Sequence, residues 1–328
     1  MLKKIILYGL LLALGLFLVT MIFVPSIDDF ALDNPLWNGM SFFRGYFRAK
    51  AISIHDVQGL HGGSIVFIIG PSKEFTRKEA DILADYVRNG GILVIADDFG
   101  PSNRLLEYMG LKIRINGSLL ADPLFKYRSM YFPQITVGAR NNTRIYYDYG
   151  SFLIAQGGGA CIGHSSSFSY IDTNMNGLRD QNEPYGPFCT IYVEHQGNGV
   201  IYIISDSSIF INSMITVGDN LDFIKDIVDR GDVYVVTDKW VMSPYTILRN
   251  NLAYMVSVLF TTSLRYPVAI LASILAYSTG KYLYRILVGK KSFYSLGRER
   301  AIERVIALHP DWDPKILRKL AEEVESYE

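Results

Sequence analysis

Oxygen-bearing side chains recur at every second position between residues 172 and 183, in the stretch DTNMNGLRDQNE. In a twelve-residue EF-hand-type loop, calcium ligands fall at positions 1, 3, 5, 7, 9 and 12, and a glycine at position 6 permits the sharp turn. Gly177 stands at position 6, and the ligand positions hold Asp172, Asn174, Asn176, Leu178, Asp180 and Glu183. We therefore predict a Ca²⁺ site, in which Leu178 contributes its backbone carbonyl and Glu183 both carboxylate oxygens.

The choice of calcium follows from the chemistry of these ligands. All of them are hard oxygen donors, and no His or Cys occupies a ligand position, which disfavours zinc and copper. Only three ligands are carboxylates, so we expect the weak affinity of extracellular modules, about 0.1 to 1 mM. The flanking helices of an EF-hand are missing, and the single loop resembles those of thrombospondin type 3 and dockerin repeats. The predicted role is structural; the alternative is a polar turn without an ion.

The two cysteines of the sequence, Cys161 and Cys189, flank this loop. If this part of the chain lies outside the cytoplasm, oxidising conditions permit a disulfide between them. A bridge around a loop of this length contributes about 3 to 4 kcal/mol in the chain-entropy treatment. We predict this disulfide, and the alternative is a pair of buried free thiols.

Residues 159–163, GACIG, fit the G-x-C-x-G nucleophile elbow of class I glutamine amidotransferases. Such an elbow needs a buried strand before the nucleophile and a helix after it. Here the stretch follows Gly157 and Gly158 and continues into SSSFSYID. We therefore expect Cys161 to be non-catalytic, although a Cys-dependent hydrolase or amidase stays open as an alternative function.

Two apolar runs decide the expected location of the chain. Residues 5–25 carry no charge and are long enough to cross a hydrocarbon layer of about 30 Å, which predicts an uncleaved membrane helix rather than a signal peptide. A second run, residues 266–289, is the weaker candidate for a membrane span. Lysines precede the first run and follow the second, so the positive-inside rule places both termini in the cytoplasm.

The expected organisation is that of a two-pass protein of the cell membrane, with its main domain outside the cytoplasm. The predicted parts are a cytoplasmic N-terminus (1–4), a first membrane helix (5–25), an extracytoplasmic domain (27–262), a second membrane helix (266–289) and a cytoplasmic tail (290–328). Whether residues 252–264 enter the membrane stays open, since 13 apolar residues suit a core or interfacial helix better than a span.

The extracytoplasmic part alternates strand and helix signals. IVFIIG (65–70) and ILVIAD (92–97) read as buried strands, and Thr76 with Glu79 forms a capping box at the start of the helix between them. LKIRI (111–115), the run after residue 198 and VYVV (233–236) supply further strands. This pattern predicts an α/β domain with a largely parallel sheet in three layers. The segment from about 116 to 195 is expected to be a β-rich insertion that holds the calcium loop.

Three stretches carry a family resemblance: NPLWNG (34–39), the block around residues 64–98, and NGVIYIISDSSIFINSM (198–214) with Asp219 and Asn220. With the first apolar run, they resemble a family of membrane-anchored proteins, domain of unknown function 4350. The resemblance implies an outer domain with a class I glutamine-amidotransferase-like fold. It carries over no catalytic residue, and the chain reads TDKW at 237–240, where such proteins often have an acidic pair and a histidine.

Acidic residues also follow two of the predicted strands. Asp97 and Asp98 end one strand and Ser205 and Asp206 end another, and ligands of open α/β sheets bind at this carboxyl edge. The alternative for such residues is ordinary helix capping.

Composition excludes several classes of function. With 32 basic and 32 acidic side chains, the chain is not expected to bind nucleic acid. No phosphate-binding loop, dinucleotide fingerprint or metal-ligand spacing of histidines is present, so an ATPase or a dehydrogenase is unsupported.

We expect a membrane-anchored, non-catalytic binding or scaffold protein, in contact with the lipid bilayer. Besides the hydrolase, a structural subunit of an envelope complex is an alternative. The amphipathic tail either docks a membrane or cytoplasmic protein partner or forms a packed helical pair without one.

Overall fold

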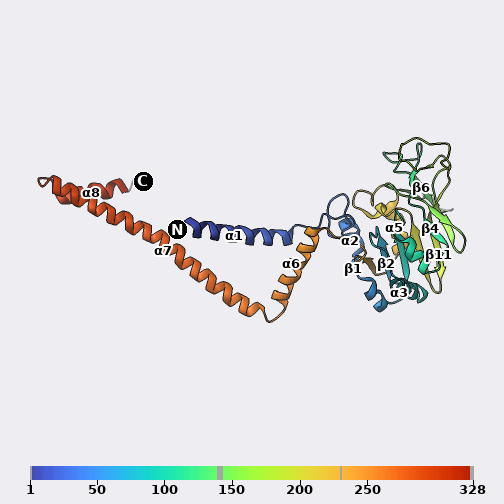
Figure 1. The fold of residues 1–328 in the computed structure, drawn as a ribbon, viewed down its shortest axis with the longest axis horizontal. Helices are drawn as coiled ribbons and strands as arrows, with labels where there is room; N and C mark the ends of the chain where they lie inside the picture. Colours follow the sequence, from blue (N-terminus) through green and yellow to red (C-terminus); the bar gives the residue numbers. More distant parts are fainter. Residues whose placement is uncertain (1, 139–142, 230, 326–328) are drawn as a thin grey trace. The chain divides into compact units, whose positions relative to one another are not determined.

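The computed structural model describes residues 2–138, 143–229 and 231–325, and within these ranges the side chains except those of 2–5, 285–299 and 321–325. The chain divides into two compact units, Met1–Leu252 and Ala253–Glu328. The first contains the α/β domain and the second is helical (Figure 1).

The first unit contains most of the regular structure. Its helices are α1 (Leu2–Phe23), α2 (Ser41–Phe47), η1 (Ile54–Gly59), α3 (Arg77–Arg88), α4 (Asn103–Tyr108), η2 (Ser208–Phe210) and α5 (Asn220–Val228). Its strands are β1 (Lys50–Ile52), β2 (Ile65–Ile69), β3 (Ile92–Ala96), β4 (Ile113–Ile115), β5 (Leu119–Ala121), β6 (Gln134–Val137), β7 (Thr143–Tyr146), β8 (Leu153–Ala155), β9 (Ala160–His164), β10 (Tyr170–Asp172), β11 (Cys189–Gln196), β12 (Gly199–Ile204) and β13 (Val233–Val236). Helix α6 (Pro244–Thr261) crosses the boundary between the units, and α7 (Arg265–Leu308) and α8 (Pro314–Glu325) follow.

The central sheet has the order β1-β13-β2-β3-β12-β11-β9-β6-β7. The first five of these strands are parallel, with Ile65 opposite Ile92 and Val200 also opposite Ile92 on its other side. From β12 onward the neighbours are antiparallel. The prediction of a mixed α/β domain with a mostly parallel central sheet is confirmed.

Two parts of the chain depart from simple strand and helix alternation. LKIRI does not extend the parallel series: β4 pairs antiparallel with β8, with Ile113 opposite Ala155. The segment 116–195 is rich in strands as predicted, but β6, β7, β9 and β11 continue the central sheet instead of forming a separate one. Pairing between strands that are distant in the sequence, such as β9 and β11, leaves no local signal.

The buried strands present alternate side chains to two separate cores. Phe67 and Val94 belong to the core that also contains Phe43 of α2 and Phe223 of α5. Their neighbours Val66, Ile68, Leu93 and Ile95 belong to the second core, with residues of α3 and α4. Because side chains alternate across a strand, each face of the sheet is covered by its own helices and the domain has three layers.

The capping box predicted at the start of α3 is present. The Glu79 N–H donates to Thr76 Oγ1 at 3.4 Å, and the Thr76 N–H donates to Glu79 Oε2 at 2.7 Å. Lys239 of the TDKW segment forms an ion pair with the same carboxylate at 2.7 Å, and both side chains are largely buried. The TDKW segment therefore connects the C-terminal end of the domain to α3 through this ion pair.

Helix α1 contains a candidate membrane span, Ile6–Phe23, which by length and composition also fits a signal sequence. The predicted second span lies within α7. Among the described side chains, α6 and Arg265–Tyr284 pass the length and composition test for a span only together, as a pair bent by 99°. A second straight span is therefore not confirmed, and the side chains of 285–289 lie outside the described ones.

Candidate ligand pocket, calcium loop and disulfide

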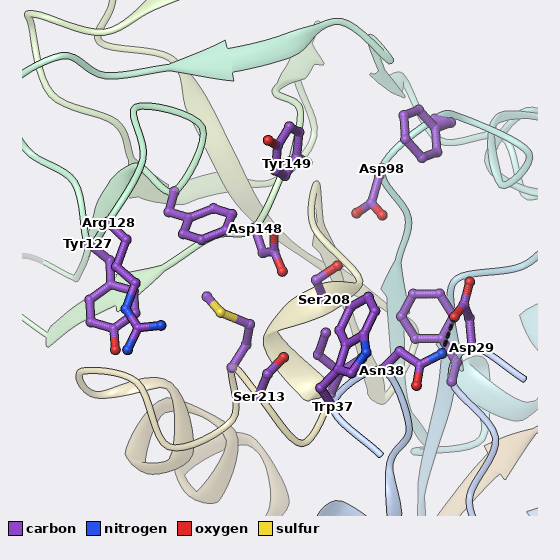
Figure 2. A pocket seen from close by; sticks show the side chains of 15 residues that line it. Asp29, Trp37, Asn38, Asp98, Tyr127, Arg128, Asp148, Tyr149, Ser208 and Ser213 are labelled. Carbon is purple, nitrogen blue, oxygen red and sulfur yellow. Dashed lines mark hydrogen bonds between the residues drawn. The ribbon is translucent and has the colours of Figure 1, made fainter. Parts of the chain in front are cut away.

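A pocket of about 680 Å³ lies at the carboxyl edge of the parallel strands β3 and β12, where open α/β sheets bind ligands (Figure 2). Chain segments from five regions of the sequence meet there. The lining residues are Asp29, Phe30, Trp37, Asn38, Asp98, Phe99, Tyr127, Arg128, Phe132, Asp148, Tyr149, Ser208, Ile211, Ser213 and Met214.

The NPLWNG motif forms a tight turn that brings Trp37 and Asn38 to this pocket. Asn34 is fully buried and fixes the turn: its Nδ2 donates to the Asp28 carbonyl at 2.9 Å, and its Oδ1 accepts from the Leu36 N–H at 2.9 Å. A Cβ on Gly39 would lie 2.1 Å from the Asn34 carbonyl oxygen, so this position requires glycine. The motif therefore has a positioning role at the pocket.

The other two stretches that carry the family resemblance end at the same pocket. The block that contains β3 supplies Asp98, and the stretch after β12 supplies Ser208, Ile211, Ser213 and Met214. The Asp219-Asn220 pair holds β7, the strand that precedes Asp148 and Tyr149, because Asn220 Oδ1 accepts from the Tyr146 N–H at 2.8 Å and Asp219 Oδ2 from the Arg144 N–H at 2.8 Å.

Three carboxylates cluster at the floor of the pocket and behind it. Asp98 accepts from the N–H of Ser207 at 2.5 Å and from its hydroxyl at 2.7 Å. Asp206 is fully buried and accepts from the Asp148 N–H at 2.7 Å and the Ser208 N–H at 2.6 Å. Backbone donors thus fix both carboxylates where β3, β12 and the loop after β7 converge.

The carboxylates raise one another's affinity for protons. Burial raises the pKa of Asp98 to about 7 despite hydrogen bonds from Ser207, and the negative charges of Asp97 and Asp148 add to the rise. Burial, together with the charge of Asp98, raises the pKa of Asp206, and burial raises that of Asp148. Strongly perturbed acids in a cleft are a frequent property of binding and catalytic sites.

Asp97 has a different role from its neighbour. Its carboxylate accepts from the N–H groups of Phe99 and Gly100 at 3.0 Å and of Ser102 at 2.6 Å, so it caps the turn that leads into α4. The capping interpretation of the acidic edge is therefore right for Asp97, whereas Asp98 lines the pocket and Asp206 lies behind it.

Two aromatic residues of the pocket have unusual backbones. Phe30 has φ 58° and Tyr149 has φ 57°, in the left-handed region that bulky residues rarely adopt. Such conformations cost about 1 to 3 kcal/mol each and persist where the surrounding structure imposes them, frequently at ligand sites.

The raised pKa of Asp98 predicts a pH dependence of stability. Below about pH 4 the carboxyl is protonated in both folded and unfolded chains, and between about pH 4 and 7 only the folded state retains the proton. The free energy of unfolding therefore falls as the pH rises from about 4 to 7, because the folded state must give up or keep at a cost a proton that the unfolded state has already lost. Melting temperatures from pH 4 to 8 should show the wild type losing stability relative to Asp98→Asn, which cannot ionise, as the pH rises from about 4 to 7. A constant difference would contradict the shift.

The predicted calcium loop begins at Asp172, the last residue of β10. Gly177 has φ 73°, as expected at position 6. Asp172 Oδ2 accepts from the Gly177 N–H at 2.9 Å, Asn174 Oδ1 from the Asn176 N–H at 3.0 Å, and Asn176 Oδ1 from the Leu178 N–H at 2.7 Å. The side-chain oxygens at positions 1, 3 and 5 are thus held by backbone donors.

The remaining ligand positions join this network. Asn174 and Asn176 both donate from Nδ2 to Asp180 Oδ2, at 2.7 and 3.1 Å. The Glu183 carboxylate is buried and accepts from the N–H groups of Thr173 at 2.7 Å and Asp180 at 2.9 Å. Residues at positions 1, 3, 5, 9 and 12 therefore gather around one short loop.

The charge state of the loop suits a cation. Burial raises the pKa of Asp172, but hydrogen bonds from Tyr131 and the loop amides outweigh it and hold the pKa below its ordinary value. The backbone N–H groups of Asp180 and Thr173 lower the pKa of Glu183. Within the described residues, however, no three His, Cys, Asp or Glu side chains are grouped closely enough to hold a metal. The donors fit calcium in type and order, but a closed carboxylate site is not formed.

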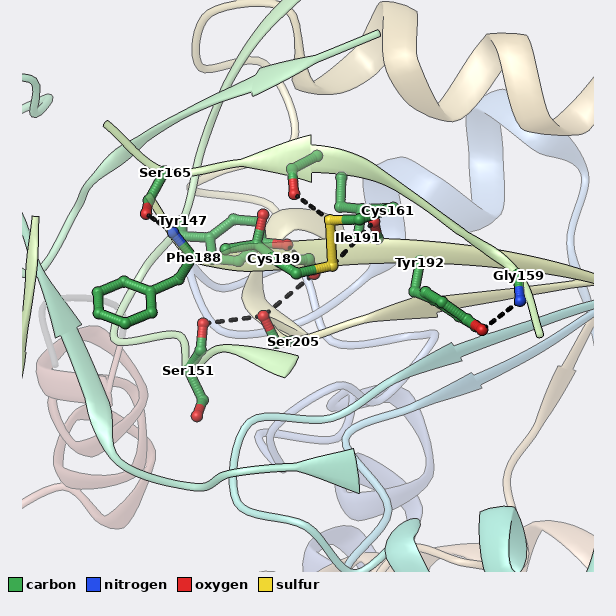
Figure 3. The surroundings of a disulfide bond; sticks show 12 residues. Tyr147, Ser151, Gly159, Cys161, Ser165, Phe188, Cys189, Ile191, Tyr192 and Ser205 are labelled. Atoms are coloured by element: carbon green, nitrogen blue, oxygen red, sulfur yellow. Dashed lines mark hydrogen bonds between the residues drawn. A yellow bond between two sulfur atoms is a disulfide. The ribbon is translucent and has the colours of Figure 1, made fainter. Parts of the chain in front are cut away.

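Cys161 on β9 and Cys189 on β11 form a disulfide, with their Cα atoms 5.8 Å apart (Figure 3). The predicted disulfide is confirmed. Cys161 lies within a strand that pairs antiparallel with β11, so the strand-to-helix turn of a nucleophile elbow is absent at this position. The bridge closes the segment that contains the calcium loop.

Several solved structures share limited similarity with the chain. The mmIFT52 N-terminal domain is 18% identical with a TM-score of 0.41, over 55% of this chain and 82% of that one. Gan42B, a GH42 beta-galactosidase from G. stearothermophilus, is 13% identical with a TM-score of 0.37, over 64% of this chain and 28% of its own length. The exo-beta-1,4-mannosidase Op5Man5 from Opitutaceae bacterium strain TAV5 is 11% identical with a TM-score of 0.25, over 60% and 25%. At these TM-scores the similarities carry no argument about function.

Among curated proteins, none matches the chain significantly in sequence. The family model described as "Domain of unknown function (DUF4350)" matches residues 33–228, a region that begins at the NPLWNG turn, includes every strand from β1 to β12 and supplies all the lining residues of the pocket except Asp29 and Phe30. Since this region is more than half of the chain, the protein belongs to the DUF4350 family.

Proposed function

We propose that this chain is a membrane-anchored binding protein whose α/β domain holds a small ligand in the pocket at the carboxyl edge of the sheet. The pocket itself is the observation that carries the proposal: all three family motifs supply or support its walls, and strained aromatic residues line it. A non-catalytic role is supported because Cys161 is bonded to Cys189 and no histidine or cysteine is among the lining residues.

The proposal includes a class I glutamine-amidotransferase-like shape that lacks the Cys-His machinery. The parallel strands covered by helices on both faces are compatible with such a shape. At the position of the acidic pair and histidine, this chain has Lys239 paired with Glu79, an ion pair that serves the fold.

We propose that α1 anchors the protein, with both termini in the cytoplasm and the α/β domain outside. Contacts within the first unit hold the segment that follows α1 against α6, so the chain would leave the α/β domain close to the point where it enters it. Tyr245 donates from its hydroxyl to the Val24 carbonyl at 3.0 Å, the Ser26 and Thr246 hydroxyls are hydrogen-bonded at 2.9 Å, and Arg249 forms an ion pair with Asp33 at 2.7 Å. An oxidised disulfide also suits a location outside the cytoplasm.

Calcium is proposed as a structural ion of the 172–183 loop. The order of oxygen donors, the positive φ of Gly177 and the depressed pKa values of Asp172 and Glu183 support it. The ion would fix a segment that has few buried apolar side chains, in cooperation with the nearby disulfide.

The binding function is tested with a variant that fills the pocket. Ser213 is exposed and lines the pocket, so Ser213→Trp should occupy it without disturbing the core; Thr216→Trp, exposed and outside the lining, is the matched control. Full-length protein in detergent is dialysed against a small-molecule extract of the cells, and retained compounds are identified by mass spectrometry.

We expect at least one compound to be enriched by the wild type and by Thr216→Trp, and not by Ser213→Trp. Equal retention by all three proteins would contradict binding in this pocket. Conversion of a compound by the wild type, lost in Cys161→Ala but retained in Cys189→Ala, which breaks the same disulfide, would instead establish the hydrolase.

A further inference from the structure

The pocket is acidic, and its acids lack basic partners. Asp29, Asp98 and Asp148 line it, and among the ion pairs of the described residues none involves these three carboxylates. Among the residues that the structure describes, Arg128 is the only basic one that lines the pocket. A concave site lined by charges of one sign concentrates ligands of the opposite sign.

Arg128 does not neutralise the acidic side. Its guanidinium lies over the Tyr127 ring, 5.0 Å from the ring centroid. Figure 2 shows Arg128 and Tyr127 at one side of the pocket, Asp29 and Asp98 at the other, and Asp148 between them. Within the described part of the chain, Asp98 and Asp148 therefore have no ion-pair partner, and Arg128 is engaged with Tyr127.

Aromatic rings at the pocket are unusually exposed. Trp37 is 68% exposed, Phe99 69% and Tyr149 46%. Tyr149 is held on two sides, by a stacked contact with Tyr131 at 5.2 Å and an edge contact with Phe132 at 5.7 Å between ring centroids. Carboxylates attract a cation through their charge, and accessible ring faces attract it through the ring quadrupole.

We infer that this pocket binds a small organic cation, an ammonium group carried on an apolar skeleton. The inference rests on the proposed function and names its ligand class. The ammonium would lie beside Asp98 and Asp148, and the apolar part would cover the rings of Trp37 and Tyr149. Removing water from both would strengthen the charge interaction, since a desolvated cation is attracted more strongly to an aromatic face than a solvated one.

Hydrogen bonding at the carboxylates is consistent with an organic cation. Asp98 accepts two hydrogen bonds from Ser207, which fix its carboxyl at the pocket, and Asp206 accepts two backbone hydrogen bonds behind it. A cation near Asp98 would offset the repulsion from Asp97 and Asp148 that contributes to its raised pKa. An ammonium group can donate to the remaining lone pairs without a full coordination shell.

The test uses matched probes of one shape, measured by titration calorimetry with the full chain in detergent at pH 8. Phenethylamine is protonated, 2-phenylethanol is neutral and phenylacetate is an anion. We expect binding of the amine, with at least about tenfold weaker binding of the alcohol and the acid. Asp148→Asn should weaken amine binding about tenfold or more, equivalent to about 1.4 kcal/mol. Asp81→Asn, an exposed acid on α3, is the control and should bind as the wild type does.

The outcomes separate the ligand class from the pocket. Equal binding of the alcohol and the amine, abolished by Ser213→Trp, would overturn the cation inference and leave the binding function standing. Absence of amine binding to a folded wild type would also overturn it. Equal weakening by Asp148→Asn and Asp81→Asn would show general charge attraction and not this site.

Discussion

Replacing both Cys161 and Cys189 with alanine should lower the free energy of unfolding by about 3 to 4 kcal/mol. The disulfide closes a loop of 28 residues between β9 and β11, and removing it restores conformational freedom to that segment in the unfolded chain. For a domain of this size, each kcal/mol corresponds to about 2 to 4 °C, so the melting temperature should fall by about 10 °C. Differential scanning fluorimetry of the full chain in detergent measures this change.

Reducing agent supplies the control for this prediction. It should lower the melting temperature of the wild type by a similar amount and leave that of the double variant unchanged. Alkylation without reductant, followed by mass spectrometry, should find the two cysteine peptides joined. Two alkylated thiols in the native protein, or a double variant as stable as the wild type, would refute the stabilising bridge.

Addition of 10 mM calcium should stabilise the domain by about 1.4 to 2.7 kcal/mol, because this concentration is about 10 to 100 times the dissociation constant expected for such a loop. Asp180→Ala should abolish the effect. Asp180 is the best position to change, since it is exposed, whereas Asp172 and Glu183 are buried and their loss would itself weaken the fold.

The matched control is Gln181→Ala, which lies next to Asp180 at a position that is not a ligand. It should respond to calcium as the wild type does, and magnesium should stabilise less, since it demands a stricter octahedral geometry. A melting curve that stays unchanged in 10 mM calcium, or an equal response of Asp180→Ala, would remove calcium from the description of this loop.

Local signals allowed much of the fold to be predicted. β2 and β3 are continuous apolar runs, and the Thr76–Glu79 capping box marks the start of α3 with two reciprocal hydrogen bonds. The disulfide was also predictable, because two cysteines flank one polar segment. Strand β4 was assigned to the wrong kind of pairing, since its partner β8 lies about 40 residues away and only the folded chain brings Ile113 opposite Ala155.

The pocket was predictable only at its floor. Acidic residues after two parallel strands pointed to the edge at Asp98 and Asp206, but the sequence did not distinguish the cap Asp97 from its neighbour. The NPLWNG stretch carried a family resemblance but did not place Trp37 at the pocket, and Tyr149 gave no signal, because these residues reach the pocket through a glycine-dependent turn and a left-handed backbone. A cluster assembled from distant segments is visible only once the sheet order is known.

The pairing of β1 with β13 has a consequence for the timing of folding in the cell. Lys50 lies opposite Tyr234, so the first strand of the sheet waits for a partner about 180 residues later in the chain. At synthesis rates of about 5 to 20 residues per second, β1 stays unpaired for about 10 to 40 s. Until β13 is made, the β2 edge on that side is also open, and an unpaired strand edge can pair with another chain.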